Sequence, residues 1–254
     1  MDFKETPYWW EAAPRPTLQE KSVQKSCDVV IIGAGFAGLT AALILARAGR
    51  NVQVFDKQRP GEGASSRNGG IASGNIKMEF SGMVSAFGEG AAKRIYAEGV
   101  AAREDLARFI EDEKIDCHFE MTGRFTGAYR PKHYDRLARE AEFLNKHLDL
   151  GAEVVVRANQ HKEVDTGLYH GGVVRPDIGG LHPGLLHQGI LDRALEAGVT
   201  VHGVTDVEGF LKDGDDFLIT TSRGTTKARD LLVCTNGYTG KTTPWLQRRI
   251  VPVP

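Results

Sequence analysis

The sequence predicts an α/β fold with a parallel sheet at its centre, and three segments lead to this class. Cys27–Ile32 is a continuous apolar run, as expected for a strand that is buried on both faces. A helical pattern follows from Phe36 to Ala48, and Asn51–Asp56 is a second short strand. Strand, helix and strand in this order are typical of a unit whose two strands lie parallel in one sheet.

Glycines at positions 33, 35 and 38 connect the first strand to the helix with the spacing G-x-G-x-x-G. In a dinucleotide-binding turn, Gly33 permits the tight turn and Gly35 lets the backbone approach a pyrophosphate, while Gly38 lets the helix pack closely on the strand. The phosphates then lie at the helix N-terminus, where N–H groups and the helix dipole favour negative charge.

Asp56 ends the second strand, about 20 residues after the glycine turn, where a carboxylate can accept hydrogen bonds from ribose hydroxyls. Strand, glycine turn, helix, strand and acid follow one another in order. Together they predict a Rossmann-like dinucleotide-binding domain. The alternative for Asp56 is a solvated carboxylate at a strand end.

The loop Gly61–Gly70 follows the second strand and combines glycines and serines with one arginine. Such a loop offers many backbone N–H donors and can wrap a phosphate or the edge of a planar ring. Arg67 would add positive charge there. An ordinary flexible surface loop is the alternative, but the position directly after a Rossmann unit favours contact with a ligand.

The segment 81–181 interrupts this pattern and is predicted to form an inserted α+β lobe. Its helices are expected from Gly82 to about Lys114 and from Pro131 to Gly151, with proline at a favourable first position of the second helix. Short strands are expected at Cys117–Met121, Arg124–Tyr129 and Glu153–Val156.

The first pattern resumes after the insertion, so segments 26–80 and 182–250 are predicted to form one domain. The elements expected here are a helix from Pro183 to Gly198 and strands at Val199–His202, Val207–Lys212, Asp216–Thr221 and Leu231–Cys234. Asp213-Gly214 is a strong hairpin turn. Thr235-Asn236-Gly237 follows the last strand and would meet a ligand at the carboxyl edge of the sheet.

Residues 1–25 are polar and contain several prolines and the aromatic cluster Tyr8-Trp9-Trp10. We expect an extended arm that packs on the body of the protein. An oligomer contact or part of a substrate entrance are the alternatives.

Composition and charge narrow the class of protein. The 254 residues are 41% hydrophobic and carry a formal net charge of −1, which indicates a globular protein and gives no sign of nucleic-acid or membrane binding. Cys27, Cys117 and Cys234 are odd in number and far apart, as expected for reduced thiols. The N-terminus lacks the layout of a signal peptide, so a cytoplasmic location is expected.

Several kinds of chemistry have no matching motif. The histidines show no metal-ligand spacing, and neither an H-E-x-x-H nor a G-x-S-x-G motif occurs. Leu39 and Thr40 stand where a P-loop would carry its lysine and hydroxyl residue. What remains is cofactor chemistry, in which the protein positions a redox ring.

A family resemblance rests on the arm Tyr8-Trp9-Trp10, the turn Gly33–Gly38, the loop Gly63–Gly70, Gly180-Leu-His-Pro183, Thr235–Gly240 and Arg249–Val253. Together these segments resemble the D-amino-acid-oxidase-like superfamily of FAD-dependent oxidoreductases, and most closely the branch that contains γ-glutamylputrescine oxidase and related amine oxidases. Arg67–Gly70 and Thr235–Gly240 are fairly specific to this branch. The resemblance spans essentially the whole chain.

The resemblance implies a Rossmann-like FAD-binding domain with an interleaved α+β substrate lobe, and FAD held without a covalent bond. The three glycines of the turn would cradle the pyrophosphate, and Asp56 would bind the adenosine ribose. Val207 would lie near the adenine, and the loop and the Thr235 strand end near the flavin. The residues expected to bind the cofactor are Gly33, Gly35, Phe36, Ala37, Gly38, Asp56, Lys57, Ser65, Ser66, Arg67, Asn68, Gly69, Val207, Thr235, Asn236 and Gly237; no metal ligands are expected.

The implied reaction is hydride transfer from the carbon that bears a substrate amine to flavin N5, followed by imine hydrolysis and reoxidation by O2 to give H2O2. A small-molecule amine or amino acid and O2 are therefore the expected partners. His182, at the turn between the two lobes, is the one candidate for a catalytic residue. A structural turn histidine is the alternative.

Two other functions stay open from the residues. A NAD(P)-dependent dehydrogenase would use the same glycine turn and Asp56, although the loop 61–70 and the late strands at 199–235 fit a flavoprotein better. The second open function is that of a truncated, inactive nucleotide-binding module, because members of the family continue past Pro254, where this chain stops. Ser66 also departs from the family loop, which more often carries glycine there.

Overall fold

The computed structural model describes residues 3–251 and divides them into two compact units. The first unit contains residues 3–69, 115–117 and 182–251, and the second contains residues 70–114 and 118–181. Residues 252–254, at the end of the chain, lie outside the described residues, so the Arg249–Val253 motif is only partly described.

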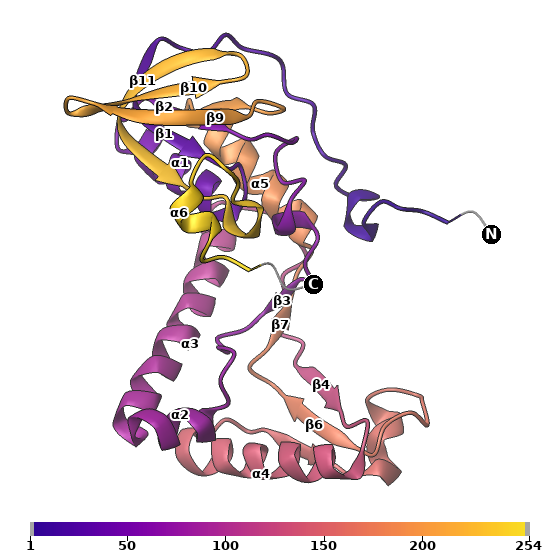
Figure 1. The fold of residues 1–254 in the computed structure, drawn as a ribbon. Helices are drawn as coiled ribbons and strands as arrows, with labels where there is room; N and C mark the ends of the chain where they lie inside the picture. Colours follow the sequence, from indigo (N-terminus) through magenta and orange to yellow (C-terminus); the bar gives the residue numbers. More distant parts are fainter. Residues whose placement is uncertain (1–2, 252–254) are drawn as a thin grey trace. The chain divides into compact units, whose positions relative to one another are not determined.

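A six-stranded sheet forms the centre of the first unit, in the order β8-β2-β1-β11-β10-β9 (Figure 1). The strands β8, β2, β1 and β11 run parallel, and β10 and β9 continue the sheet as antiparallel strands. The expected α/β fold with a parallel sheet is confirmed. The strand bounds are β1 Ser26–Ile32, β2 Val52–Phe55, β8 Thr200–His202, β9 Val207–Asp213, β10 Asp216–Thr221 and β11 Gly224–Val233.

Helices α1 (Phe36–Arg47) and α5 (Pro183–Glu196) pack against each other on one side of this sheet (Figure 1). Ile31 points toward α1, since its Cγ2 would lie 3.3 Å from a Cβ on Gly38. Its neighbours Val30 and Ile32 point the other way, as alternation along a strand requires. They join a buried cluster with side chains of β2, β9, β10 and β11. Both faces of β1 are therefore buried, which explains its unbroken apolar run.

The first unit also contains short helical turns at Tyr8–Trp10 (η1), Ala64–Ser66 (η2) and Asn236–Tyr238 (η4), and the helix α6 at Pro244–Gln247.

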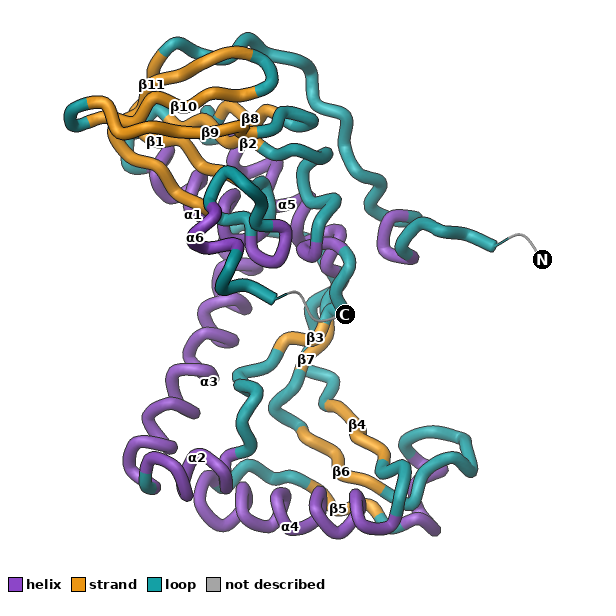
Figure 2. Tube along the Cα trace, in the orientation of Figure 1, coloured by secondary structure: helices purple, strands orange, loops and turns teal. Residues whose placement is uncertain are grey.

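Three helices and five strands build the second unit, together with one 3-10 turn. Figure 2 shows the three-stranded sheet β4-β6-β5 next to α4. A cluster with Phe80, Met83, Tyr96 and Leu144 joins α2, α3 and α4. The bounds are β3 Ile71–Ala72, α2 Phe80–Phe87, α3 Glu89–Asp112, β4 Arg124–Gly127, α4 Pro131–Leu148, β5 Glu153–Val155, η3 Arg157–Lys162, β6 Gly172–Arg175 and β7 Gly179–Gly180.

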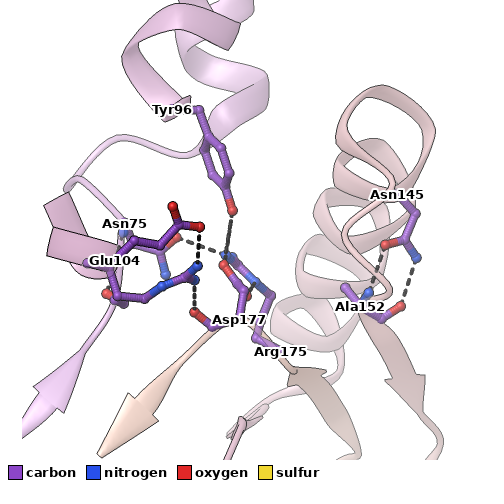
Figure 3. A network of polar contacts seen from close by, with 9 residues as sticks. Asn75, Tyr96, Glu104, Asn145, Ala152, Arg175 and Asp177 are labelled. Carbon is purple, nitrogen blue, oxygen red and sulfur yellow. Dashed lines mark hydrogen bonds and ion pairs between the residues drawn. The ribbon is translucent and has the colours of Figure 1, made fainter. Parts of the chain in front are cut away.

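Partly buried polar contacts connect α3 to the segment after β6 (Figure 3). The Arg175 guanidinium donates to both carboxylate oxygens of Asp177, at 2.8 and 2.6 Å, and to the Tyr96 hydroxyl at 3.0 Å and Asn75 Oδ1 at 2.9 Å. The Tyr96 hydroxyl in turn donates to Asp177 Oδ2 at 3.1 Å. Burial raises the pKa of Tyr96 to about 12, so its proton stays in place for this bond.

The structure corrects two secondary-structure expectations. The helix expected over 82–114 is two helices, because Gly88 has a φ of +78° and ends α2 before α3 begins. The strand expected at Cys117–Met121 is wrong. His118 has a φ of +52°, and only Glu120 forms a bridge, to Gly180.

The second unit begins at Gly70, earlier than the expected residue 81. The reason is a non-local strand pair, in which Ile71 and Ala72 of β3 pair with Gly180 and Gly179 of β7. Residues 115–117 belong to the first unit, where Ile115 packs beside Gly189 of α5. The assignment of the two units to cofactor and substrate stays a prediction.

No helix within residues 3–251 is long and apolar enough to cross a membrane.

The close approach of α3 to the backbone at Gly74 can be tested by substitution of a glycine. A Cβ on Gly99, within α3, would overlap the Gly74 carbonyl oxygen, whereas a Cβ on Gly90 of the same helix would have only Arg94 Nη1 within 4 Å, at 3.7 Å. We expect Gly99→Ala to lower the free energy of unfolding by about 1–3 kcal/mol, the usual range for overpacking. Gly90→Ala should be neutral or stabilise by up to about 1 kcal/mol. Urea unfolding checks both, and equal effects would contradict the close approach.

Candidate functional site

A cavity of about 350 Å³ lies at the carboxyl edge of the parallel strands of the first unit. Parallel sheets bind ligands at this edge because loops after neighbouring strands converge there. The lining comes from the ends of β1, β2 and β11, the loop 61–65, the start of β9 and the segment after β11: Ile32, Gly33, Gly35, Phe55, Asp56, Lys57, Gln58, Gly61, Gly63, Ala64, Ser65, Thr205, Asp206, Val207, Glu208, Val233, Cys234, Thr235, Asn236, Tyr238, Gly240, Lys241, Thr242 and Thr243.

The glycine turn has no room for side chains. Gly33 has a φ of +108°, and a Cβ there would lie 2.6 Å from the Cys234 carbonyl oxygen. A Cβ on Gly38 would overlap the Gly33 carbonyl oxygen, and one on Gly35 would lie 2.8 Å from Ser65 Oγ. Gly33 and Gly35 line the cavity, whereas Gly38 lies behind the turn and lets α1 approach β1. The geometry therefore explains why each of the three positions carries glycine, and the pyrophosphate contact at Gly35 stays a prediction.

Asp56 is partly buried at the end of β2 and lines the cavity. Its carboxylate accepts the Ala34 N–H at 2.8 Å and the Gln58 N–H at 2.9 Å. Burial raises the pKa of Asp56, and these two backbone hydrogen bonds oppose the increase. The carboxylate thus connects β2 to the glycine turn, and it is not freely solvated.

Ser65 connects the loop 61–70 to α1, and Ser66 forms a hydrogen bond within the loop. Ser65 Oγ accepts the Phe36 N–H, the first of α1, at 3.0 Å. Ser66 is fully buried, and its hydroxyl donates to the Gly61 carbonyl at 2.6 Å. Arg67 lies over the Trp10 ring, with its Cζ 4.8 Å from the ring centroid. Asn68 Nδ2 donates to the carbonyls of Ala64 and Ser65, both at 3.1 Å.

The structure brings about half of the expected cofactor residues together around the cavity. Those in its lining are Gly33, Gly35, Asp56, Lys57, Ser65, Val207, Thr235 and Asn236. The others stand outside this lining: Phe36, Ala37, Gly38, Ser66, Arg67, Asn68, Gly69 and Gly237. Packing accounts for several of these, since Gly38 and Ser66 lie behind the surface and Arg67 faces the arm. The cofactor contacts of both groups stay predictions.

The segment after β11 contributes lining residues beyond those that were expected to bind the cofactor. Tyr238 and residues 240–243 line the cavity. Thr242 Oγ1 donates to the Val207 carbonyl at 2.6 Å, and Lys57 Nζ lies 3.5 Å from the Tyr238 carbonyl oxygen. The available signal was the polar, glycine-containing stretch directly after an apolar strand.

His182 is the N-terminal cap of α5. Its Nδ1 accepts the Leu185 N–H at 3.1 Å, and its ring lies edge to face with Trp9 at 4.9 Å between centroids. His182 is not part of the cavity lining. The structure therefore shows a capping contact for this ring, and a catalytic role stays a prediction.

His187, on α5, is a buried contact of the glycine turn. Its Nε2 lies 2.8 Å from the Ala34 carbonyl oxygen, and its Nδ1 lies 3.1 Å from Arg15 Nη1. Burial lowers the pKa of His187 to about 4, with a smaller effect from the Arg15 charge. The ring is therefore neutral at pH 7. No local motif marks this residue, because its partners are distant in the sequence.

The sheet, the glycine turn and the acidic strand end define the class of α/β proteins with a Rossmann-type dinucleotide-binding turn. The chain belongs to the DAO family of FAD-dependent oxidoreductases, whose family model matches residues 28–254. The family resemblance and the expectation of FAD as the cofactor are thereby confirmed. The match favours FAD over the NAD(P) alternative.

Individual relatives agree with this assignment. The chain is 28% identical over 252 residues to "Probable oxidoreductase OrdL" of Rhizobium meliloti, covering 96% of this chain and 58% of that protein. It is 29% identical over 245 residues to "Gamma-glutamylputrescine oxidoreductase" of Escherichia coli, covering 94% and 55%. The chain thus spans just over half the length of these two relatives.

Solved structures show the same fold. Glycine oxidase from Geobacillus kaustophilus superposes with a TM-score of 0.73 at 19% identity, over 88% of this chain and 59% of that one. At this identity the similarity concerns the fold alone.

His187 should make the stability of the protein depend on pH. Its pKa is about 4 when folded and about 6.5 as an ordinary histidine, so below pH about 6.5 the unfolded chain binds more protons at this position. Stability from His187 is therefore fully present above pH about 6.5 and is lost as the pH falls toward 4. The slope should be about 1.4 kcal/mol per pH unit.

Chemical unfolding of the wild type and of His187→Gln between these pH values gives two free energies of unfolding, and the pH dependence of their difference measures this slope. Other titrating groups are common to both proteins and cancel. A constant difference across the window would show that His187 is not buried in its neutral form.

Proposed function

We propose that this chain binds FAD in the cavity at the carboxyl edge of its sheet and is the cofactor-binding part of an oxidoreductase that acts on an amine or amino acid. The observation that carries the proposal is that Gly33, Gly35 and Asp56 line one cavity within the segment matched by the FAD-dependent family. The name of one relative, γ-glutamylputrescine oxidoreductase, supports the substrate class.

The residues present fit a dinucleotide. Gly33 and Gly35 line the cavity and carry no side chain, so the turn offers its backbone to a pyrophosphate there. The N-terminus of α1 opens directly after the turn and favours negative charge. Lys57 and Lys241 line the same cavity, as do Asp206 and Glu208, so the lining carries charges of both signs. The volume of about 350 Å³ lies in the range of ligand pockets, roughly 300–1,000 Å³.

The roles of the chain's residues follow from these positions. The backbone of the glycine turn would hold the pyrophosphate, and Asp56 would accept hydrogen bonds from the ribose. Ser65 fixes the loop 61–70 against α1, which keeps that wall of the cavity in place. The adenine contact at Val207 rests on the family resemblance, and its carbonyl accepts the Thr242 hydroxyl in this structure.

When bound, FAD supplies the acceptor for a hydride from the carbon that bears the substrate amine, and O2 is the proposed oxidant that restores it. The chain's own part is to bind and orient, which is where hydride transfer gains most of its rate. Hydrolysis of the imine to a carbonyl compound and release of H2O2 complete the proposed reaction. His182 caps α5 and is retained only as a candidate for contact with substrate.

FAD binding is the first test. The purified protein should be yellow, with absorbance maxima at roughly 370 and 450 nm, and the apoprotein should bind added FAD. Asp56→Asn should weaken FAD binding about tenfold or more, because a charged hydrogen bond is worth about 1.5–3 kcal/mol.

Asp28→Asn is the matched control for this test. Asp28 also accepts a backbone N–H, from Asn51 at 2.8 Å, but at the opposite end of β1 from the glycine turn. It should leave FAD affinity unchanged. A colourless protein that binds NADH and not FAD would contradict the proposal.

Reduction of the bound flavin tests the oxidoreductase assignment separately. Under anaerobic conditions, γ-glutamylputrescine or glycine should bleach the flavin absorbance near roughly 450 nm, and O2 should restore it. Flavin that binds but is not reduced by primary amines, secondary amines or amino acids would indicate a nucleotide-binding module without turnover. That result would leave the FAD site intact and overturn the enzymatic part.

A further inference from the structure

Two tryptophans of the N-terminal arm hold the loop 61–70 without lining the cavity themselves. The Trp10 indole N–H donates to Ser66 Oγ at 2.7 Å, and that hydroxyl donates onward to the Gly61 carbonyl at 2.6 Å. The Trp9 indole N–H donates to the Asn68 carbonyl at 2.9 Å. Because Ser66 is fully buried, its hydrogen-bond partners are set by the fold and not by exchange with water.

A second connection runs from the arm to the glycine turn through His187. The Ala34 carbonyl can only accept a hydrogen bond, so His187 Nε2 must carry the proton. The Arg15 guanidinium can only donate, so His187 Nδ1 must be the acceptor. Arg15 therefore selects the one neutral tautomer of His187 that can donate to the Ala34 carbonyl. The N–H of the same residue, Ala34, is bound by Asp56.

The His187 ring also contacts the loop 61–70, which lines the cavity beside the glycine turn. A Cβ on Gly61, whose φ is +76°, would overlap the His187 ring, so the loop rests directly on the imidazole. Arg15 is itself only 5% exposed, and its remaining hydrogen bonds go to the Ala13 and Gly184 carbonyls. A buried guanidinium is costly unless its nitrogens have hydrogen-bond partners, and these three residues supply at least one partner to each nitrogen.

We propose that residues 9–15 of the arm are a positioning segment of the cofactor site: the Trp9 and Trp10 indoles fix the loop 61–70, and Arg15 fixes the glycine turn through His187. None of these residues touches the cavity, so each acts through another group. The inference rests on the proposed FAD site. It gives the aromatic arm a role distinct from an oligomer contact or a substrate entrance.

The test compares FAD affinity of the intact apoprotein and its variants, by flavin fluorescence well below the unfolding transition of each variant. Trp10→Phe keeps an aromatic ring but removes the indole N–H, and Arg15→Gln removes the charge and most of the donors. Each should weaken FAD binding about tenfold, or about 1.4 kcal/mol. Glu11→Gln is the control and should bind FAD like the wild type, because the Glu11 carboxylate pairs with the exposed Lys4 ammonium.

His187 gives a pair of variants of similar size. His187→Gln can place its amide N–H where Nε2–H lies and should keep most of the affinity, whereas His187→Leu leaves the Ala34 carbonyl without this donor and should lose about tenfold or more. If His187 only stabilises the fold, both substitutions should lower the unfolding temperature and leave the FAD affinity of the folded protein unchanged.

Hydrogen exchange of the apoprotein gives a readout without FAD. Trp10→Phe should speed amide exchange in residues 61–70, and Arg15→Gln in residues 33–38, while Glu11→Gln changes neither. If His187→Leu does not fold, the FAD affinity and amide exchange of Trp10→Phe and Arg15→Gln test the positioning role.

The two proposals fail in different ways. Variants that bind FAD as tightly as the wild type, with unchanged exchange, would overturn the positioning role and leave the FAD site standing. A wild type that binds no FAD would overturn the proposed function, whatever the exchange data show.

Discussion

The close approach of Gly38 to the Gly33 carbonyl is the contact on which the first unit depends. A side chain at position 38 would overlap that carbonyl, so α1 can begin directly behind the turn only with glycine there. This places the N-terminus of α1 beside the ends of β1 and β2. The cavity, the buried face of Ile31 and the contact of Ser65 with the first N–H of α1 all follow from that placement.

The cavity is assembled from parts that are distant in the chain and joined by hydrogen bonds to the backbone. Asp56 binds the Ala34 N–H, and His187 binds the Ala34 carbonyl. Both backbone polar groups of Ala34, its N–H and its carbonyl, are thus held by side chains from other elements. A turn held from both sides is pre-organised, and a ligand then loses less free energy to ordering it.

Local sequence signals predicted well those features that depend on neighbouring residues. The spacing of Gly33, Gly35 and Gly38, the apolar run of β1 and the proline at the start of α5 each act within one or two turns of chain. β11 shows the limit. Leu231–Val233 at its end lie within the predicted strand, but its first half is mostly polar and pairs with β10, so no continuous apolar run marks it. Gly88 likewise breaks a helix whose periodicity alone looked continuous.

The sequence by itself determined the α/β class, the dinucleotide-binding turn and the family, because glycine spacing and strand periodicity report steric limits of the local backbone. Only the tertiary structure decided which side chains surround the cavity and which support it from behind. Ser66 and Arg67 contact Trp10 of the arm. His187 contacts both Arg15 and the glycine turn, and all these partners are far apart in the sequence. Such contacts depend on how whole elements pack, and a buried hydrogen bond between distant residues leaves no periodic trace in the chain.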